Sequence, residues 1–279
     1  MPNLVYLNSK YIPFKDAKIP IEDRGFQFSD SVYEVVKVIN KKILDFDFHM
    51  RRLKCSTTEL KFNFKINSIL LKKIFENLII KNKLSNGIIY FQITRGVQSR
   101  EHAYRKNLKP NVIIYTSKKK FNLPNKNYKG FKAITYPDIR WGRPDIKTTS
   151  LLANIIASTE ANKKGAYETI LFKGKKITEA AHSNVWIVKG NKIITHPANK
   201  EILKGVTRTV LINIIHSLDL KLIEKEFSLN ELYKSDEVFI TSSGSLVTPI
   251  IQIDNIKINN KKIGKITKTL ALSFYKSII

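Results

Sequence analysis

Residues 138–147 combine two arginines with a lysine in a way that suits covalent chemistry. A lysine acts as a nucleophile only when its amine is partly neutral near pH 7, which burial or nearby cations promote. Lys147 follows Arg140 and Arg143 and precedes a pair of leucines at 151–152. This setting favours a reactive lysine. The alternative is a solvated loop lysine beside two arginines that are paired with carboxylates.

Two turns rich in glycine, serine and threonine suit anion binding. The turn at 204–207 precedes a predicted helix, where backbone N–H groups and the Thr207 hydroxyl can hold a phosphate. The turn at 241–245 follows a predicted strand and can form a nest of N–H groups. Each turn also has a simpler explanation, because Thr207 could only cap its helix and the second turn could be an ordinary one.

Several common site signatures are absent from the sequence. No GxGxxG, GxxxxGK[ST], HExxH or GxSxG pattern occurs, which argues against the usual nucleotide, zinc-protease and hydrolase sites. The single cysteine, Cys55, leaves no partner for an intrachain disulfide and no cysteine cluster for zinc. We therefore expect no metal and a reducing, cytoplasmic environment.

Hydrophobic periodicity predicts the elements that position these residues in the first part of the chain. We expect short strands and turns over 4–30, including strands at 5–7 and 18–21, and two strands within 31–47 around a turn at 40–42. Helices are expected at 49–62 and 69–80, followed by strands at 87–94 and 111–116.

A polar segment with three consecutive lysines, Pro124 and Gly130 then predicts a linker. Beyond it we expect a strand at 131–136, helices at 151–164, 207–218 and 263–278, a β-rich meander over 167–195, and strands at 238–241 and 247–253. Neither half alternates strictly between strand and helix, so the predicted fold class is α+β. The predicted domains are an N-terminal α/β domain at 1–117, a linker at 118–130 and a β-rich α+β domain at 131–279.

The composition raises one competing function. The 279 residues carry a formal net charge of +26, which is compatible with a nucleic-acid-binding protein. However, only nine of the 49 basic residues are arginine, and the lysines are scattered among many isoleucines and asparagines. A compositional bias explains this charge better than a binding stripe does. No apolar run approaches the roughly 18 residues of a membrane-spanning helix, so we expect a soluble protein with neither nucleic-acid nor membrane partners.

The motifs together resemble the class IV, or fold-type IV, pyridoxal-phosphate-dependent aminotransferases, and among them the D-amino acid (D-alanine) aminotransferases. The resemblance runs nearly end to end. It includes EDRGFQF at 22–28, VYEVV at 32–36, HxxRL at 49–53, YFQITRG at 90–96, DIK at 145–147, TE at 178–179, SNV at 183–185, LKGVTR at 203–208 and TP at 248–249. It implies a two-domain enzyme with pyridoxal 5′-phosphate between the domains.

The resemblance also implies which residues bind this cofactor. Lys147 matches the Schiff-base lysine, which holds the cofactor aldehyde and then shuttles a proton. Glu179 matches the acid that pairs with the pyridine nitrogen. The remaining matches are Arg52, Val206, Thr207 and Ser243, which would hold the phosphate, and Leu203, which would pack on one face of the ring.

Tyr33, Arg100 and His102 match the carboxylate trap of the D-amino acid enzymes, in which the arginine and histidine reach across from the partner subunit. Arginine supplies a forked cation, and the other two add directed donors. The resemblance thus implies a homodimer that moves an amino group between a D-amino acid (D-alanine, D-glutamate) and a 2-oxo acid (pyruvate, 2-oxoglutarate) in a ping-pong cycle. From the residues alone, an exposed loop that carries Arg100 and His102 is the favoured interpretation, and the resemblance reverses it.

Two segments depart from the family pattern. Ser29 and Ser31 lie in a loop where the family often has glycine, and Ala180, Ala181 and His182 stand where relatives commonly have glycine and serine. The second segment bears on the preference for the substrate side chain. The alternatives of the same fold are a branched-chain L-amino acid aminotransferase and an aminodeoxychorismate lyase.

Overall fold

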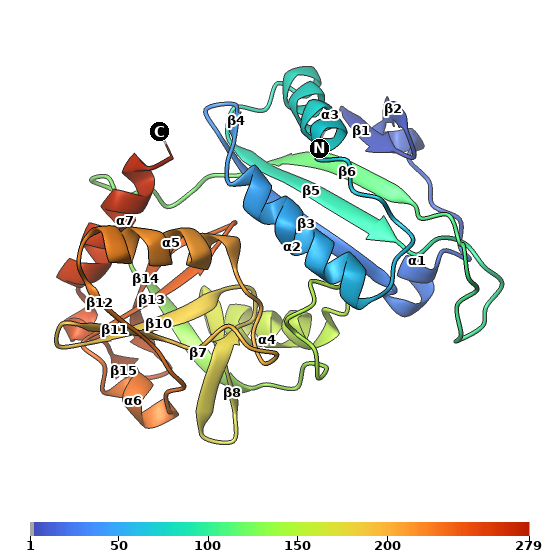
Figure 1. Cartoon of the computed structure of the whole chain (residues 1–279). Helices are drawn as coiled ribbons and strands as arrows, with labels where there is room; N and C mark the ends of the chain where they lie inside the picture. Colours follow the sequence, from blue (N-terminus) through green and yellow to red (C-terminus); the bar gives the residue numbers. More distant parts are fainter. Residues whose placement is uncertain (1–2, 279) are drawn as a thin grey trace. The chain divides into compact units, whose positions relative to one another are not determined.

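The computed structural model describes residues 3–278 (Figure 1). The chain divides into two compact units. Unit 1 comprises Met1–Lys120 and Ile146–Ser150, and unit 2 comprises Phe121–Asp145 and Leu151–Ile279. The segment that carries Lys147 therefore packs in unit 1, whereas we expected it in the second domain. Five residues carry too little hydrophobic pattern to show which core they join.

Unit 1 is built on a six-stranded antiparallel sheet in the order β2-β1-β6-β5-β3-β4. Helices α2 and α3 pack on one face of this sheet, over a core that includes Val36, Leu53, Phe75 and Phe91 (Figure 1). The elements are β1 (Leu4–Leu7), β2 (Lys10–Pro13), η1 (Phe14–Asp16), α1 (Arg24–Phe28), β3 (Ser31–Ile39), β4 (Lys42–Ile43), α2 (Phe46–Glu59), α3 (Ser68–Lys81), β5 (Gly87–Thr94) and β6 (Val112–Lys118). The two predicted helices and the main strands are confirmed with shifted ends.

The segment Ile146–Ser150 lies along the edge of β3. The backbone N–H of Tyr33 donates to the carbonyl of Lys147 at 3.0 Å, and the N–H of Thr149 donates to the carbonyl of Ser31 at 3.2 Å. These bonds are the backbone contacts of neighbouring antiparallel strands. They fix Lys147 beside the start of β3.

The region before β3 corrects one expectation. No strand forms at 18–21, where Ile21 is 78% exposed, and helix α1 follows instead. Asp23 caps α1, because its carboxylate accepts two helix N–H groups at 2.8 and 3.3 Å. The same carboxylate also accepts bonds from the Thr94 hydroxyl and the Asn111 amide. Tertiary contacts therefore set this short helix, and local alternation of apolar residues could not reveal it.

Unit 2 contains a nine-stranded mixed sheet in the order β12-β11-β10-β13-β14-β7-β8-β9, with β15 beside β14. Helix α4 contacts β7 and β8, α5 packs against β12 and β13, and α7 packs against β13 and β14. The elements are β7 (Phe131–Pro137), α4 (Leu152–Lys163), β8 (Glu168–Lys173), β9 (Lys176–Ala180), β10 (Asn184–Lys189), β11 (Lys192–Thr195), α5 (Val206–Ser217), β12 (Lys221–Glu224), α6 (Leu229–Tyr233), β13 (Glu237–Ser242), β14 (Leu246–Ile253), β15 (Ile256–Lys257), η2 (Asn259–Lys261) and α7 (Lys265–Lys276). The predicted α+β class is confirmed.

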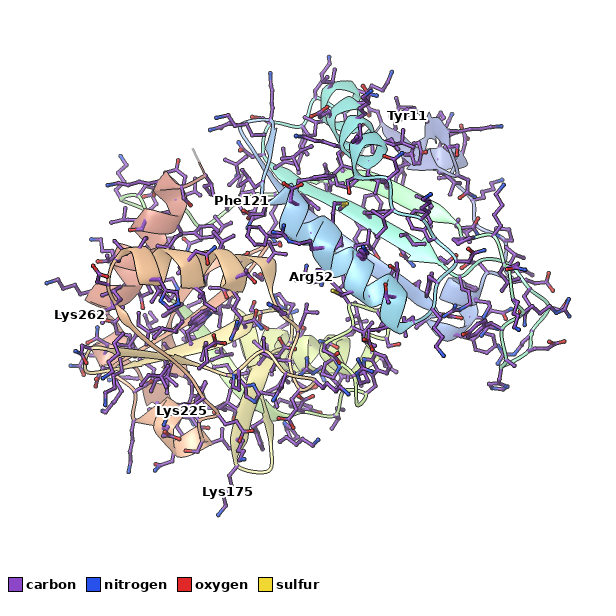
Figure 2. All side chains as sticks on the ribbon, viewed as in Figure 1. Tyr11, Arg52, Phe121, Lys175, Lys225 and Lys262 are labelled. Carbon is purple, nitrogen blue, oxygen red and sulfur yellow. The ribbon has the colours of Figure 1, made fainter. Side chains whose placement is uncertain are left out.

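Lysine side chains are spread over the surface of the molecule. Lys175, Lys225 and Lys262 are exposed and point outward from unit 2 (Figure 2). Within residues 3–278, none of the helices combines the length and the apolar character needed to cross a bilayer.

Candidate active site

Lys147 is half-buried and lies against an aromatic ring. Its Nζ is 4.1 Å from the centroid of the Tyr33 ring, and its backbone N–H donates to the Ser56 hydroxyl at 3.2 Å. No carboxylate of residues 3–278 forms an ion pair with this amine. Lys147 therefore differs from a surface lysine neutralised by a carboxylate, and its position suits a nucleophile.

Arg52 lies on α2 (Figure 2). Ser56 follows it by four residues on the same helix, so the spacing places both side chains on the same helix face. Its guanidinium donates to both carboxylate oxygens of Glu34, with Nε and Nη2 at 2.8 and 2.7 Å. His49 Nδ1 lies 2.7 Å from the same carboxylate. The fork of Arg52 is therefore oriented by a fully buried acid.

The charges around Glu34 decide its ionisation. Burial raises the pKa of Glu34, but the charge and hydrogen bonds of Arg52 and the bond from His49 outweigh this effect and lower the pKa to about 2. Burial also lowers the pKa of His49 below its ordinary value. Glu34 is thus ionised and paired with Arg52, while burial favours the neutral form of His49.

In unit 2, Glu179 is buried and accepts three hydrogen bonds. Arg140 Nη1 and the backbone N–H of Leu203 donate to Oε1, the latter at 3.0 Å. The side-chain amide of Asn184 donates to Oε2 at 2.9 Å and also to the carbonyl of Leu203 at 2.9 Å. Burial raises the pKa of Glu179 above its ordinary value, and the charge and hydrogen bond of Arg140 and the bond from the Leu203 N–H act against this rise.

The start of helix α5 lies beside this carboxylate. Gly205 is the N-cap, and no side chain caps the helix. A Cβ on Gly205 would lie 2.1 Å from Asn184 Oδ1, so glycine permits the close approach of the helix start to Asn184. Backbone N–H groups at the start of a helix, here beginning at Val206, suit a phosphate dianion.

Ser243 lies at the same end of the sheet. Asn184 on β10 faces Thr241 on β13, and Ser243 is in the turn that directly follows β13. The Ser243 side chain is half-buried. Unit 2 thus gathers at one end the predicted residues Glu179, Leu203, Val206, Thr207 and Ser243.

These arrangements fit pyridoxal phosphate. The buried group formed by Asp138, Arg140 and Glu179 has two acids and one base, so it leaves one negative charge for a protonated ring nitrogen to balance. Also in unit 2, the start of α5 suits a phosphate. In unit 1, taken by itself, the Lys147 amine forms no ion pair within residues 3–278 and suits an aldehyde.

The structure does not bring the three predicted substrate residues together within one chain. Tyr33 lies beside Lys147, whereas Arg100 and His102 are exposed and pack against Phe28. Arg100 Cζ is 4.7 Å from the centroid of the Phe28 ring, and the centroids of the His102 and Phe28 rings are 5.6 Å apart. Arg24 holds their loop by donating to two of its backbone carbonyls, at 2.7 and 2.9 Å. Neither Arg100 nor His102 contacts Tyr33 among the described residues.

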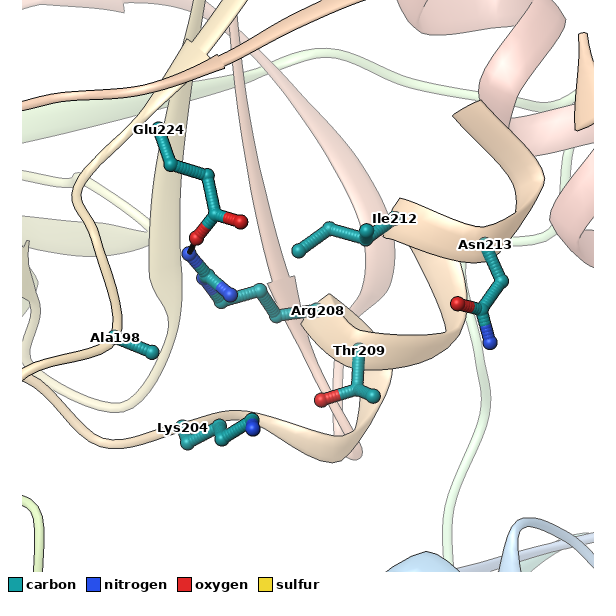
Figure 3. A pocket seen from close by; sticks show the side chains of 7 residues that line it. All are labelled: Ala198, Lys204, Arg208, Thr209, Ile212, Asn213 and Glu224. Carbon is teal, nitrogen blue, oxygen red and sulfur yellow. Dashed lines mark hydrogen bonds and ion pairs between the residues drawn. The ribbon is translucent and has the colours of Figure 1, made fainter. Parts of the chain in front are cut away.

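Two other features of unit 2 lie outside this set. A hollow of about 370 Å³ beside α5 is lined by Ala198, Lys204, Arg208, Thr209, Ile212, Asn213 and Glu224, and Arg208 is already ion-paired with Glu224 there (Figure 3). His196, Glu201 and Glu226 bring three potential metal-ligand atoms within 4.8 Å of one another. Lys176 already pairs with Glu226, so we assign no metal to this cluster.

Comparison with known proteins places the chain in a family. The family described as amino-transferase class IV matches residues 31–253. D-alanine aminotransferase of Listeria monocytogenes is 36% identical over 276 residues, which are 98% of this chain and 96% of that protein. The chain belongs to the class IV aminotransferases. D-alanine aminotransferase of Staphylococcus aureus is 34% identical and covers 98% of this aminotransferase and 97% of its own chain.

Solved structures confirm the fold of this class IV aminotransferase. The branched-chain amino acid aminotransferase of Escherichia coli superposes with a TM-score of 0.90 at 22% identity, covering 99% of this chain and 94% of its own. The PLP form of the branched-chain enzyme from Thermobaculum terrenum gives a TM-score of 0.88 at 22% identity, with the same coverage. Class IV aminotransferases depend on pyridoxal phosphate, so the predicted cofactor is confirmed.

Three residues of this site were not identified from the sequence. The sequence assigned no role to Glu34, Asn184 or Arg140. In the structure Glu34 binds Arg52, while Asn184 and Arg140 bind Glu179. The signal for Arg140 was its type, because arginine is rare in this lysine-rich chain and its planar fork suits a carboxylate. Only the fold shows that this carboxylate is Glu179.

Proposed function

We propose that this class IV aminotransferase transfers the amino group of D-amino acids, such as D-alanine and D-glutamate, to 2-oxo acids such as pyruvate and 2-oxoglutarate. The observation that carries the proposal is the end-to-end identity of 34–36% with proteins named D-alanine aminotransferase. The proposal is also supported by Tyr33, Arg100 and His102. These are the three amino-acid types that bind the substrate carboxylate in the D-amino acid enzymes that this chain resembles. Membership of this family also favours an enzyme over the nucleic-acid-binding alternative.

The proposed roles follow from the chemistry of each group. Pyridoxal phosphate supplies an aldehyde that reacts with amines and a ring that withdraws electrons from the substrate Cα. Lys147 would hold the aldehyde at rest and would carry the proton that leaves the substrate Cα. Glu179 would accept a hydrogen bond from the ring N–H. By the resemblance, Arg52, the start of α5 and Ser243 would hold the phosphate, and Leu203 would pack on the ring.

The substrate carboxylate is proposed to bind between two chains. Tyr33 stands next to Lys147 in its own chain, while Arg100 and His102 are exposed on the loop that Arg24 supports. A loop fixed at its backbone but exposed at its side chains can serve a neighbouring subunit. We therefore propose a homodimer in which each chain lends Arg100 and His102 to the other. The cytoplasmic location and the linker at 118–130 stay predictions.

Substrate choice is the direct test. The purified enzyme is supplied with 2-oxoglutarate and either D-alanine or L-leucine, and formation of the 2-oxo acid product is followed over time. We expect turnover of D-alanine at least tenfold faster than that of L-leucine, because the trap orients one enantiomer for proton removal. Preference for L-leucine would replace the proposal with branched-chain transamination, the activity named for the solved structures above. Lys147→Ala serves as the inactive control.

A further inference from the structure

We infer that Arg140, clamped by Asp138, is a positioning residue that keeps Glu179 ionised and turned toward the ring nitrogen of the cofactor. This inference rests on the proposed role of Glu179. It concerns the stretch before Lys147 whose arginines the sequence singled out without a function.

Asp138 holds Arg140 in one orientation. Arg140 Nε and Nη2 donate to the two oxygens of Asp138 at 2.9 and 2.7 Å, and the Arg140 backbone N–H donates to the same carboxylate at 3.1 Å. The Thr178 hydroxyl adds a further bond to Asp138 at 2.7 Å. The Arg140 and Asp138 side chains are only 6% and 8% exposed. A bidentate pair of this kind fixes the plane of the guanidinium.

The Nη1 atom of Arg140, which does not bind Asp138, donates to Glu179 and limits how Glu179 can bind a ligand. A carboxylate oxygen offers two acceptor positions. Arg140 and the Leu203 N–H occupy both positions of Oε1, and Asn184 occupies one of Oε2. Within residues 3–278, the acceptor position that remains is therefore on Oε2. The N–H of the cofactor ring would therefore bind Glu179 at this one position of Oε2.

Arg140 also determines the charge of this site. Asp138 and Glu179 are two buried acids, and in the absence of a cation between them, burial and mutual repulsion would favour protonation of one. A protonated Glu179 would present a neutral group to the ring and could not balance a ring cation. Arg140 thus opposes the protonation of Glu179 that burial favours, at the place where the ring needs an anion.

The same loop contains a matched pair that does not reach Glu179. Arg143 Nε and Nη2 donate to the two oxygens of Asp145 at 2.9 and 2.8 Å, with the same two-residue spacing as the pair of Asp138 and Arg140. Loss of Arg143 removes an ion pair of the same geometry, though a more exposed one, from the loop while the Glu179 contacts remain. Arg143→Gln is therefore the control for Arg140→Gln.

The test compares two cofactors that differ only at the ring nitrogen. Full-length enzyme is stripped and loaded with pyridoxal phosphate or with its 1-deaza analogue, in which CH replaces that nitrogen, and both dissociation constants are measured by equilibrium dialysis. We expect the wild type and Arg143→Gln to prefer pyridoxal phosphate. In Arg140→Gln this preference should fall about tenfold or more, with affinity for the analogue nearly unchanged.

Equal losses for both cofactors in Arg140→Gln would overturn the inference, because they would indicate damage to the loop alone. An unchanged preference would overturn it as well. If Arg140→Gln does not fold, Arg140→Lys keeps the charge without the two-point clamp and must also show a reduced preference. A wild-type protein that binds neither cofactor would instead refute the proposed function, so the two failures are distinguishable.

Discussion

Glu34 is fully buried, yet Arg52 and His49 keep its carboxylate charged. Its folded pKa of about 2 lies below the ordinary 4.5, so the folded state gains stability from the charged form. That gain is complete above pH 4.5 and is lost as the pH falls from 4.5 through 2. By the size of the pKa shift it amounts to about 3 kcal/mol.

Glu34→Gln should therefore lower the free energy of unfolding by roughly 3 kcal/mol at pH 7, because the buried charged group that pairs with Arg52 and His49 is lost. The difference from the wild type should shrink between pH 4.5 and pH 2. Urea unfolding followed by circular dichroism at several pH values measures both effects. Glu76→Gln, on the exposed face of α3, should change stability by no more than about 0.5 kcal/mol. A difference that stays constant down to pH 2 would refute this account of Glu34.

The sequence could identify individual residues only where their chemistry or their motif was distinctive. Lys147 was suggested by neighbouring arginines, and the resemblance supplied the roles of Glu179 and Arg52. Asn184 lies in the SNV motif, but nothing indicated its role, because its hydrogen-bond partners lie five and 19 residues away in the sequence. Such long-range hydrogen bonds are created by the fold and are not present in any local pattern.

Among the elements, α5 has the clearest link between a local feature and the proposed chemistry. Its N-cap Gly205 has ordinary backbone angles, φ −62° and ψ 138°, so alanine could adopt them. The added Cβ would nevertheless meet Asn184 Oδ1 at 2.1 Å. Asn184 would have to move, and its bonds to Glu179 and Leu203 would be weakened.

Gly205→Ala should thus raise the dissociation constant of pyridoxal phosphate by about tenfold, in line with the loss of one hydrogen bond to a charged group. Fluorescence titration of the stripped enzyme measures this constant. Gly142→Ala is the matched control, since a Cβ there meets nothing within 4 Å. The same affinity in both variants would show that the close approach of α5 to Asn184 is unimportant.

Strongly periodic elements could be predicted from the sequence, and short ones could not. Apolar residues such as Leu71, Phe75 and Leu78 repeat at helical spacing and fixed α3 to within one residue at each end. Strand β12 has only four residues, none of them fully buried, and pairs in parallel with β11. Helix α6 spans five residues and depends on a capping box between Ser228 and Glu231. Both elements are too short for a periodic signal.

At the level of the molecule, the α+β class and the family followed from the sequence, whereas the assignment of 146–150 to unit 1 did not.

The homodimer is a proposal with its own test. Chains carrying Lys147→Ala are mixed, unfolded and refolded together with chains carrying Arg100→Ala and His102→Ala. If each chain lends its trap to the partner, half of the random dimers contain one intact site, and about a quarter of wild-type activity should return. No recovery in mixed dimers, with each parent inactive, would show that the trap acts within one chain.

The central claim is that Lys147 holds the cofactor, and covalent trapping tests it most directly. The enzyme purified with pyridoxal phosphate is reduced with borohydride, digested and mapped by mass spectrometry. The account predicts a phosphopyridoxyl group on the peptide that contains Lys147 and on no other peptide at comparable yield. A label on a different lysine, or its persistence in full yield in Lys147→Ala, would contradict it.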